Sequence, residues 1–215
     1  GKFDSSLTGI ISGAGSLVKD GTGQLSLTQD NTYSGGTQIA AGKVALDANA
    51  ALGTGKATFA QNTELSLGVT QGVSVANAVQ VDGPIKVHSG QFDSNLDGVV
   101  SGVGSLVKDG AGTLTLKGTN IYEGGTVVSD GTLAISQNAN LGKAETGVTV
   151  SNATLLLNGD IAIERKVTLA GTTATLNTAQ DTSSSLDDAV SGTAKLIKTG
   201  DGTLTLNTAN SYAGG

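Results

Sequence analysis

The single histidine, His88, is the first residue to test for catalysis, because Ser89 and Asp93 follow it closely. A nucleophilic triad needs its serine and histidine within hydrogen-bond reach of each other. Neighbouring residues of a strand point to opposite faces, and the alternation that starts at Ile85 predicts an outward His88. One histidine also cannot build a multi-histidine metal site. We interpret His88 as a solvated surface side chain.

Carboxylates offer a second chemistry, the cleavage of acidic polysaccharides. The densest group of carboxylates consists of Asp181, Asp187 and Asp188, in an expected Ser-rich loop. The only arginine of the chain lies in Glu164-Arg165-Lys166. Hydrolysis needs two carboxyl groups about 5 Å or about 6.5–9.5 Å apart, and a lyase needs a base and neutralisation of the substrate's charge. One arginine neutralises little uronate charge. We expect residues 164–166 to form an exposed turn and the chain to be no enzyme, with polysaccharide cleavage as the weaker alternative.

Short glycine motifs resemble fragments of binding loops. The segments Asp20-Gly-Thr-Gly23 and Gly200-Asp-Gly202 lack the tandem repetition of a calcium-binding solenoid, and Gly53-Thr-Gly-Lys56 lacks the first glycine and the final Ser or Thr of a phosphate loop. The sequence therefore predicts no metal and no cofactor.

The composition limits the kinds of element that could position any site. Of 215 residues, 33 are Gly, one is Pro and none is Cys, and the net charge is −6. A nucleic-acid binder needs a basic face, so nucleic acid is not expected as a partner. Without cysteine there is neither a disulfide framework nor a thiolate metal site. No apolar run approaches the roughly 18 residues of a membrane span, so we expect no membrane insertion.

The chain repeats itself with a long period. The segment that begins at Ser12 recurs from Ser101 and again from Ser191, at offsets of 89 and 90 residues. Residues 1–52 align with residues 90–141 at 28 of 52 positions. Self-similarity at a fixed period indicates a repeat architecture. We expect one continuous domain with a first repeat at 1–89, a second at 90–178 and an incomplete third at 179–215.

Within each period the dominant signal is short apolar alternation, which is typical of strands with one inward face. Nowhere does helical spacing persist for ten residues. The expected strand cores are Leu25-Ser-Leu27, Val44-Ala-Leu46, Leu65-Ser-Leu67, Val73-Ser-Val75, Val79-Gln-Val81, Ile85-Lys-Val87, Leu114-Thr-Leu116, Leu133-Ala-Ile135, Val148-Thr-Val150, Ile161-Ala-Ile163 and Val167-Thr-Leu169.

Strands this short fit either an antiparallel sandwich or barrel, or a parallel β-solenoid. A closed barrel cannot add a unit of 89 residues, and two-residue hairpin turns are scarce, with Asn158-Gly159 the best candidate. Small and β-branched residues also suit a narrow stacked interior. We therefore predict an all-β solenoid of about 9–10 coils, about four per long repeat, forming a rod of roughly 45 Å at about 4.8 Å per coil.

One turn marks each repeat. It reads N-x-Y-x-G-G and occurs at Asn31, Tyr33, Gly35, Gly36; at Asn120, Tyr122, Gly124, Gly125; and at Asn210, Tyr212, Gly214, Gly215. The first two copies continue through Gly42-Lys-Val-Ala-Leu46 and Gly131-Thr-Leu-Ala-Ile135 to Leu-Gly. With the preceding G-x-L-x-K-x-G-x-G-x-L-x-L, this pattern resembles the passenger-associated transport repeat of bacterial autotransporters.

The turn residues themselves suggest structural roles. Gly35-Gly36 permits positive φ and close backbone approach, Asn31 can bond turn backbone, and Tyr33 offers a ring that can lie over the coil end and a hydroxyl that needs water or a partner. Four coils would separate successive tyrosines by roughly 19 Å, too far for a stacking ladder.

The resemblance implies a right-handed parallel β-helix on the surface of a Gram-negative bacterium, exported through the periplasm and through a C-terminal outer-membrane β-barrel of the same precursor. It implies a non-enzymatic stalk that folds sequentially during export and presents adhesive or virulence elements. The alternative is an adhesin whose coils bind a host-cell or matrix receptor directly. The third motif copy ends at Gly215, before the Thr that follows Gly-Gly in the others, which predicts further sequence beyond it.

Overall fold

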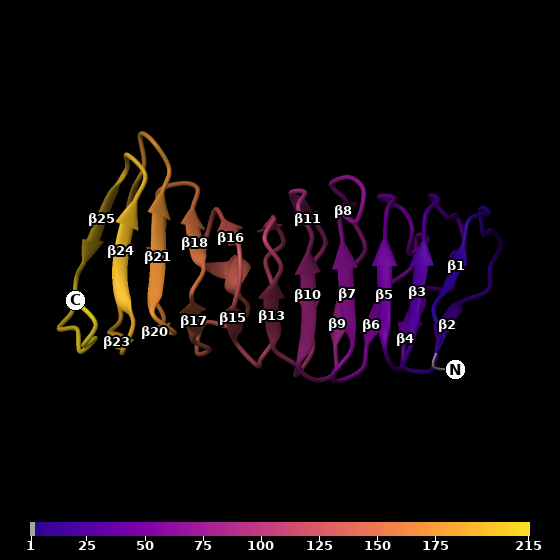
Figure 1. The fold of residues 1–215 in the computed structure, drawn as a ribbon, viewed down its shortest axis with the longest axis horizontal. Coiled ribbons are helices and arrows are strands. Elements are labelled where there is room, and N and C mark those ends of the chain that lie inside the picture. The colour runs from indigo at the N-terminus through magenta and orange to yellow at the C-terminus, as the bar shows by residue number, and fades with distance from the viewer. Residues whose placement is uncertain (1–2) are drawn as a thin grey trace.

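The computed structural model describes residues 3–215, in which 25 short strands wind into an elongated column with no α-helix. The strands stand side by side along the long axis, and the two ends of the chain lie at opposite ends of the column (Figure 1). Every strand pair is parallel, for example Leu25 beside Val44 and Leu155 beside Leu176. The prediction of a parallel β-solenoid is confirmed, and Asn158-Gly159 forms no hairpin.

One side of the column is a ten-stranded sheet that runs through all the coils. Its strands are β1 (Ser5–Leu7), β3 (Gln24–Leu27), β5 (Lys43–Leu46), β7 (Glu64–Leu67), β10 (Ile85–Ser89), β13 (Leu106–Asp109), β15 (Thr126–Val128), β17 (Val148–Ser151), β20 (Val167–Ala170) and β23 (Val190–Gly192). Ten strands mean ten coils, and nine steps of about 4.8 Å give a column of about 43 Å.

The second side is a seven-stranded sheet that begins in the fourth coil. It contains β8 (Ser74–Val75), β11 (Ser94–Leu96), β14 (Thr113–Leu116), β16 (Thr132–Ile135), β18 (Thr154–Leu157), β21 (Thr173–Thr178) and β24 (Lys195–Thr199).

The third side is split between a five-stranded sheet in the early coils and a three-stranded sheet in the late coils. The first contains β2 (Leu17–Lys19), β4 (Thr37–Ile39), β6 (Ala57–Phe59), β9 (Val79–Val81) and β12 (Val100–Ser101), and the second β19 (Ala162–Ile163), β22 (Ser183–Leu186) and β25 (Thr203–Leu206). Between them lies the short 3-10 helix η1 (Asn138–Leu141).

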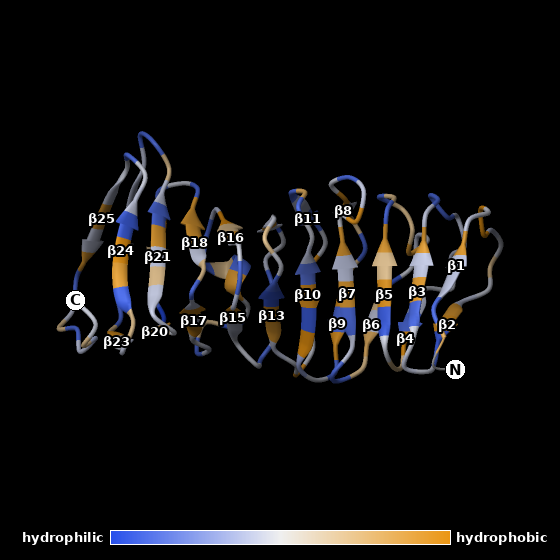
Figure 2. Ribbon diagram, in the orientation of Figure 1, coloured by the Kyte–Doolittle hydropathy of each residue, from blue (hydrophilic) through white to orange (hydrophobic). Residues whose placement is uncertain are grey.

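Alternation explains the interior. In a strand such as Val79–Val81 the two valines are buried and Gln80 is half-buried, and the ladder formed by Leu25, Val44, Leu65 and Val87 stacks aliphatic groups coil upon coil. Figure 2 shows strands that carry both hydrophobic and hydrophilic residues, as sheets with one buried face require. Each coil buries its apolar side chains only against neighbouring coils, so stability is built from nearest-neighbour contacts.

The long repeat does not return to the same side of the column. Strands β2, β4, β6, β9 and β12 are successive coils of one sheet, yet Leu106, the repeat equivalent of Leu17, lies in β13, the next strand along the chain, in the ten-stranded sheet. Likewise Leu25 lies in the ten-stranded sheet and its equivalent Leu114 in the seven-stranded sheet. One repeat therefore spans four coils plus one side, so equivalent residues face directions about one third of a turn apart.

Candidate functional site

The motif turn, residues 31–36 and their equivalents 120–125 and 210–215, replaces a strand wherever it occurs. The first copy lies between β3 and β4, where the seven-stranded sheet has no strand, and the second lies between β14 and β15, where the third side is interrupted. The third copy follows β25, at the position of the ten-stranded sheet. The motif therefore moves by one side with each repeat, and Tyr33 and Tyr122 lie on different sides of the column.

The asparagine of the motif bridges three coils. Asn31 accepts a hydrogen bond from the Ile11 amide with Oδ1 (2.7 Å) and donates from Nδ2 to the Ala51 carbonyl (2.7 Å). Asn120 repeats the pattern with the Val100 amide (2.7 Å) and the Asn140 carbonyl (2.6 Å). Both asparagines are buried, and each satisfies backbone groups 20 residues before and 20 residues after itself.

Asn210 makes the same backward contact but a different forward one. Its Oδ1 accepts from the Val190 amide (2.8 Å), whereas its Nδ2 donates to the Thr208 carbonyl two residues before it (2.9 Å). The forward contact seen at Asn31 and Asn120 therefore depends on a following coil that supplies a carbonyl.

Tyr33 and Tyr122 are interior side chains and do not lie over a coil end as expected, and Tyr212 of the third copy is half-buried. Tyr33 is 1% exposed and Tyr122 is fully buried. The Tyr33 hydroxyl is hydrogen-bonded to Thr37, and the Tyr122 hydroxyl to Thr126. Burial raises the pKa of both phenols, that of Tyr122 to about 12. Each hydroxyl therefore stays protonated and neutral at physiological pH, anchored inside its coil.

The paired glycines let successive coils approach closely. A Cβ on Gly35 would lie 2.6 Å from the Gly15 carbonyl oxygen, and one on Gly124 would lie 2.5 Å from the Ser105 amide nitrogen. The second glycine of each pair has positive φ, +84° at Gly36 and +81° at Gly125, a conformation that favours glycine. In the third copy Gly214 would meet Ala194 in the same way, with a Cβ 2.3 Å from its carbonyl carbon.

In the first two repeats a lysine is buried, Lys19 and Lys108, a feature that reasoning from the sequence missed; the equivalent Lys198 is exposed. Lys108 occupies an interior position between Val87 and Val128 and is fully buried. Its Nζ donates to the carbonyls of Asp109 (3.1 Å), Gly110 (2.6 Å) and Asp130 (3.0 Å), which joins two consecutive corners of the column. Burial lowers the pKa of Lys108 to about 8. Its equivalents Lys19 and Lys198 bind the matching corner carbonyls of Gly21 and Gly200.

Arg165 corrects the expectation of an exposed turn at residues 164–166. Its neighbours Glu164 and Lys166 are exposed, but Arg165 is 2% exposed. Its guanidinium donates to the carbonyls of Asn138 (2.9 Å), Leu141 (2.9 Å), Gly142 (3.3 Å), Lys143 (3.1 Å) and Thr146 (3.3 Å), and to Asn138 Oδ1 (2.8 Å). Arg165 therefore satisfies the carbonyls of η1 and of the loop after it, and it has no free donors for a substrate acid.

Asp181, Asp187 and Asp188 do not form a cluster in a loop. The serines between them belong to β22, with Asp181 before the strand and the other two after it. Asp187 accepts a hydrogen bond from Asn207 (2.7 Å), and Asp188 accepts one from the amide of Ala189 (2.7 Å). These two carboxylates are turn acceptors.

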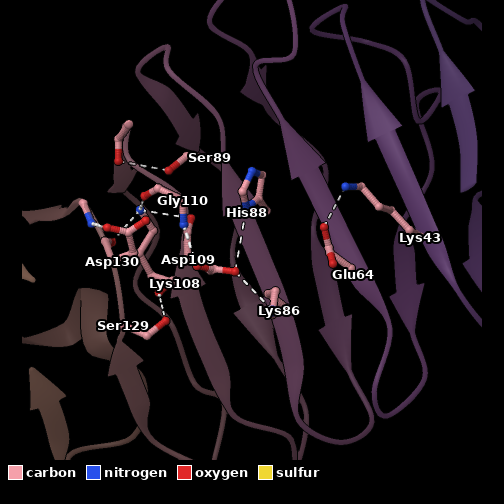
Figure 3. Close-up of polar contacts among 12 residues, drawn as sticks. Lys43, Glu64, Lys86, His88, Ser89, Lys108, Asp109, Gly110, Ser129 and Asp130 are labelled. Atoms are coloured by element: carbon pink, nitrogen blue, oxygen red, sulfur yellow. Dashed lines mark hydrogen bonds and ion pairs between the residues drawn. The ribbon is translucent and has the colours of Figure 1, made fainter. Parts of the chain in front are cut away.

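His88 lies on the outer face of the ten-stranded sheet, as predicted, within a line of charges across neighbouring coils (Figure 3). Lys43 pairs with Glu64 (2.9 Å), and Asp109 contacts both Lys86 (3.1 Å) and His88 Nδ1 (3.7 Å). The hydrogen bond with Asp109 raises the pKa of Lys86. Burial opposes ionisation of Asp109, but bonds from Lys86 and the Gly110 amide outweigh it and lower its pKa.

Neighbouring Ser89 points inward, where its hydroxyl donates to the Gly112 carbonyl (3.0 Å), so His88 and Ser89 cannot act together. Across residues 3–215 no three His, Asp or Glu side chains gather closely enough to hold a metal ion. The same residues contain no helix long and apolar enough to cross a membrane.

Comparison with known proteins agrees with the repeat pattern. The family model described as passenger-associated-transport-repeat matches residues 17–46, 106–135 and 196–215. A curated relative, the adhesin BmaC autotransporter of Brucella suis biovar 1 (strain 1330), is 37% identical over 137 residues, which cover 61% of this chain but only 4% of the relative's length. No solved structure gave a significant match. The chain therefore resembles passenger-associated-transport repeats in these three segments, and it spans only a small part of the autotransporter relative that it matches.

Proposed function

We propose that this segment works as a non-enzymatic stalk that stands outside the cell and folds coil by coil as it emerges. The observation that carries the proposal is the in-register stacking of ten parallel coils, whose apolar ladders are buried only against the coils before and after them. Burial is worth about 25 cal/mol per Å² of apolar surface, so each new coil gains free energy as soon as the preceding coil is in place.

The motif asparagines support the same sequence of events. Asn31 and Asn120 accept from the preceding coil and donate to the following one, so each can receive a new coil only after its own has formed. Folding outside the cell would then bias movement outward through the outer-membrane pore of the precursor. In this model the surface location and the passage through the periplasm follow from the export route.

Display of the protein on the cell surface tests this coupling. Leu25→Asp and Leu114→Asp place carboxylates in the buried column, whereas Val18→Asp changes a residue on the outer face that is 56% exposed. We expect surface protease accessibility and antibody labelling to fall sharply in the two interior variants and to stay normal for Val18→Asp. Normal display of the interior variants would refute coupling between coil folding and export.

A second function, direct adhesion by these coils, is favoured by the name of the relative, which is an adhesin. Saturable, receptor-dependent binding of the 215-residue chain to host cells or matrix would support it. Polysaccharide cleavage is the weaker alternative, because the arginine it would require is held by backbone carbonyls of residues 138–146. The cleavage hypothesis would be supported if the chain released reducing or unsaturated ends from acidic polysaccharide and Arg165→Ala abolished that release.

A further inference from the structure

A hollow of about 400 Å³ lies at the corner where the ten-stranded sheet passes into the seven-stranded sheet. Two consecutive coils make unusually long connections here, residues 68–73 after β7 and residues 90–93 after β10. We call this feature the corner hollow; its main side chains are Gln24, Lys43, Val69, His88, Gln91 and Phe92.

The second repeat provides an internal comparison that separates what the fold needs from what it does not. Lys43 corresponds to Thr132, in strands β5 and β16, and His88 corresponds to Asn177, in strands β10 and β21. Thr and Asn occupy these outward positions in the same kind of coil, so the fold does not require a lysine and a histidine there. By contrast, the motif asparagines, tyrosines and glycines are identical in both repeats.

The lining of the corner hollow contains basic side chains and no acidic ones. Lys43 and His88 are its titratable lining groups, and no carboxylate lines it, although the chain as a whole carries −6. Glu64 and Asp109 contact these two side chains from along the sheet. Figure 3 shows Lys43 on β5 and His88 on β10, on either side of β7, with Glu64 beside Lys43 and Asp109 beside His88. A lysine ammonium and an imidazole N–H are both hydrogen-bond donors that suit a carboxylate.

The other side chains that line the corner hollow are apolar or carry an amide group. Val69 is 54% exposed and Phe92 is 41% exposed, an uneven distribution of apolar surface that interaction sites commonly show. The Cβ of Phe92 lies against the start of the 68–73 connection, only 3.4 Å from the place where a Gly68 Cβ would stand. Gln24 and Gln91 add donors and acceptors beside this apolar surface.

We propose that the corner hollow binds a carboxylate-bearing sugar unit of an acidic polysaccharide. The apolar face of the pyranose would lie against Phe92 and Val69, its hydroxyls would meet the glutamine amides, and its carboxylate would face Lys43 and His88. This binding site goes beyond the stalk function, because the column could stand and fold without it.

The test is calorimetric titration of the 215-residue chain with an oligogalacturonate. The methyl-esterified oligomer is the matched ligand control, because it keeps the sugar and removes the charge. Sialyllactose against lactose distinguishes the two common sources of an acidic sugar. The protein variant carries Lys43→Thr and His88→Asn, the residues found at the equivalent positions of the second repeat, so its coils should fold normally. Lys117→Thr, which removes an exposed ion pair with Asp97 (3.0 Å), is the matched control.

We expect the charged oligomer or sialyllactose to bind, its uncharged counterpart to bind at least about tenfold more weakly, and the double variant to be weakened by about the same factor, as the removal of one charge-assisted contact predicts. Lys117→Thr should bind like the unmodified chain. Equal binding of charged and uncharged sugars, unchanged binding by the double variant, equally tight binding of poly-glutamate, or no binding of either acidic sugar would each overturn the proposal.

Discussion

Replacement of Arg165 gives the most direct measure of how this column is held together. The first repeat has Asn77 at the equivalent position, where Nδ2 donates to the carbonyls of Gly53 (2.9 Å) and Gly55 (2.7 Å). In the second repeat the connection from Leu141 to β17 is two residues longer than the connection from Leu52 to β6. The longer loop presents more carbonyls, and an arginine replaces the asparagine that serves the shorter loop.

The size of the effect depends on the hydrogen bonds that the guanidinium makes. A hydrogen bond from a charged donor contributes about 1.5–3 kcal/mol, but bonds from one group are not additive, and loop carbonyls near the surface regain water. Loss of the guanidinium leaves its carbonyl partners without a donor, which costs about 1–3 kcal/mol for each carbonyl that stays buried. We therefore expect Arg165→Ala to lower the free energy of unfolding by about 3–5 kcal/mol, within the range known for buried polar networks.

Arg165→Asn should recover little, because the shorter side chain cannot span the longer loop. Deletion of Ala144 and Glu145 in the Arg165→Asn background gives the loop the length found in the first repeat, and we expect it to restore most of the stability. Lys166→Ala, an exposed neighbour, is the control.

The assay is urea unfolding followed by far-ultraviolet circular dichroism, with hydrogen exchange of residues 138–147 as a local readout. A change of less than about 0.5 kcal/mol for Arg165→Ala, the usual range of a surface substitution, would refute this role for the arginine. A combined deletion variant no more stable than Arg165→Asn alone would refute the match between side-chain length and loop length.

Three further predictions concern the repeated motifs. Asn120→Ala leaves two buried backbone groups without partners and should cost about 2–5 kcal/mol in urea unfolding, clearly more than Asn210→Ala, and equal costs would contradict the three-coil bridge. Gly142→Ala places a Cβ 2.7 Å from the Tyr122 ring at φ +81° and should lower the melting temperature by several degrees, about 4 °C or more, whereas an unchanged melting curve would show that the ring can move. The pKa of Lys108 is lowered to about 8, so the folded chain binds fewer protons than the unfolded chain between about pH 8 and 10.5. The free energy of unfolding should therefore rise with pH across that window. Lys108→Met should lack this rise, and a pH profile identical to that of the unmodified chain would refute the prediction.

Most of the fold could be predicted from the sequence because the interior is built from alternation and repetition. Leu25-Ser-Leu27 and Val79-Gln-Val81 were expected as strands and lie in β3 and β9. The strand β22 was missed, because Ser183–Leu186 is polar by composition and is held in place by pairing with β19 and β25 rather than by hydrophobic burial alone.

The buried cations show a different limit. The alternation Leu106-Val107-Lys108 places the lysine on the same face as the leucine, so its inward direction could have been predicted from the spacing. Arg165 gave no comparable signal, because its acceptors are backbone carbonyls 19–27 residues away that only the coil length brings beside it. Every residue has a backbone carbonyl, so the residue types do not show which carbonyls accept a hydrogen bond.

The offset of one side per repeat explains why the motif and the corner hollow have to be interpreted differently. A motif that appears on three sides in turn makes the same contacts at each, since Asn31 and Asn120 bridge coils alike although they lie on different sides. The motif residues are therefore required by local backbone geometry, irrespective of the side of the column on which they lie. Lys43 and His88 do not recur, and a site that occurs once on a rotating repeat has one direction in space. Selection for recognition would have to act on such unrepeated positions, because any feature copied with the repeat would point away from the first by about a third of a turn.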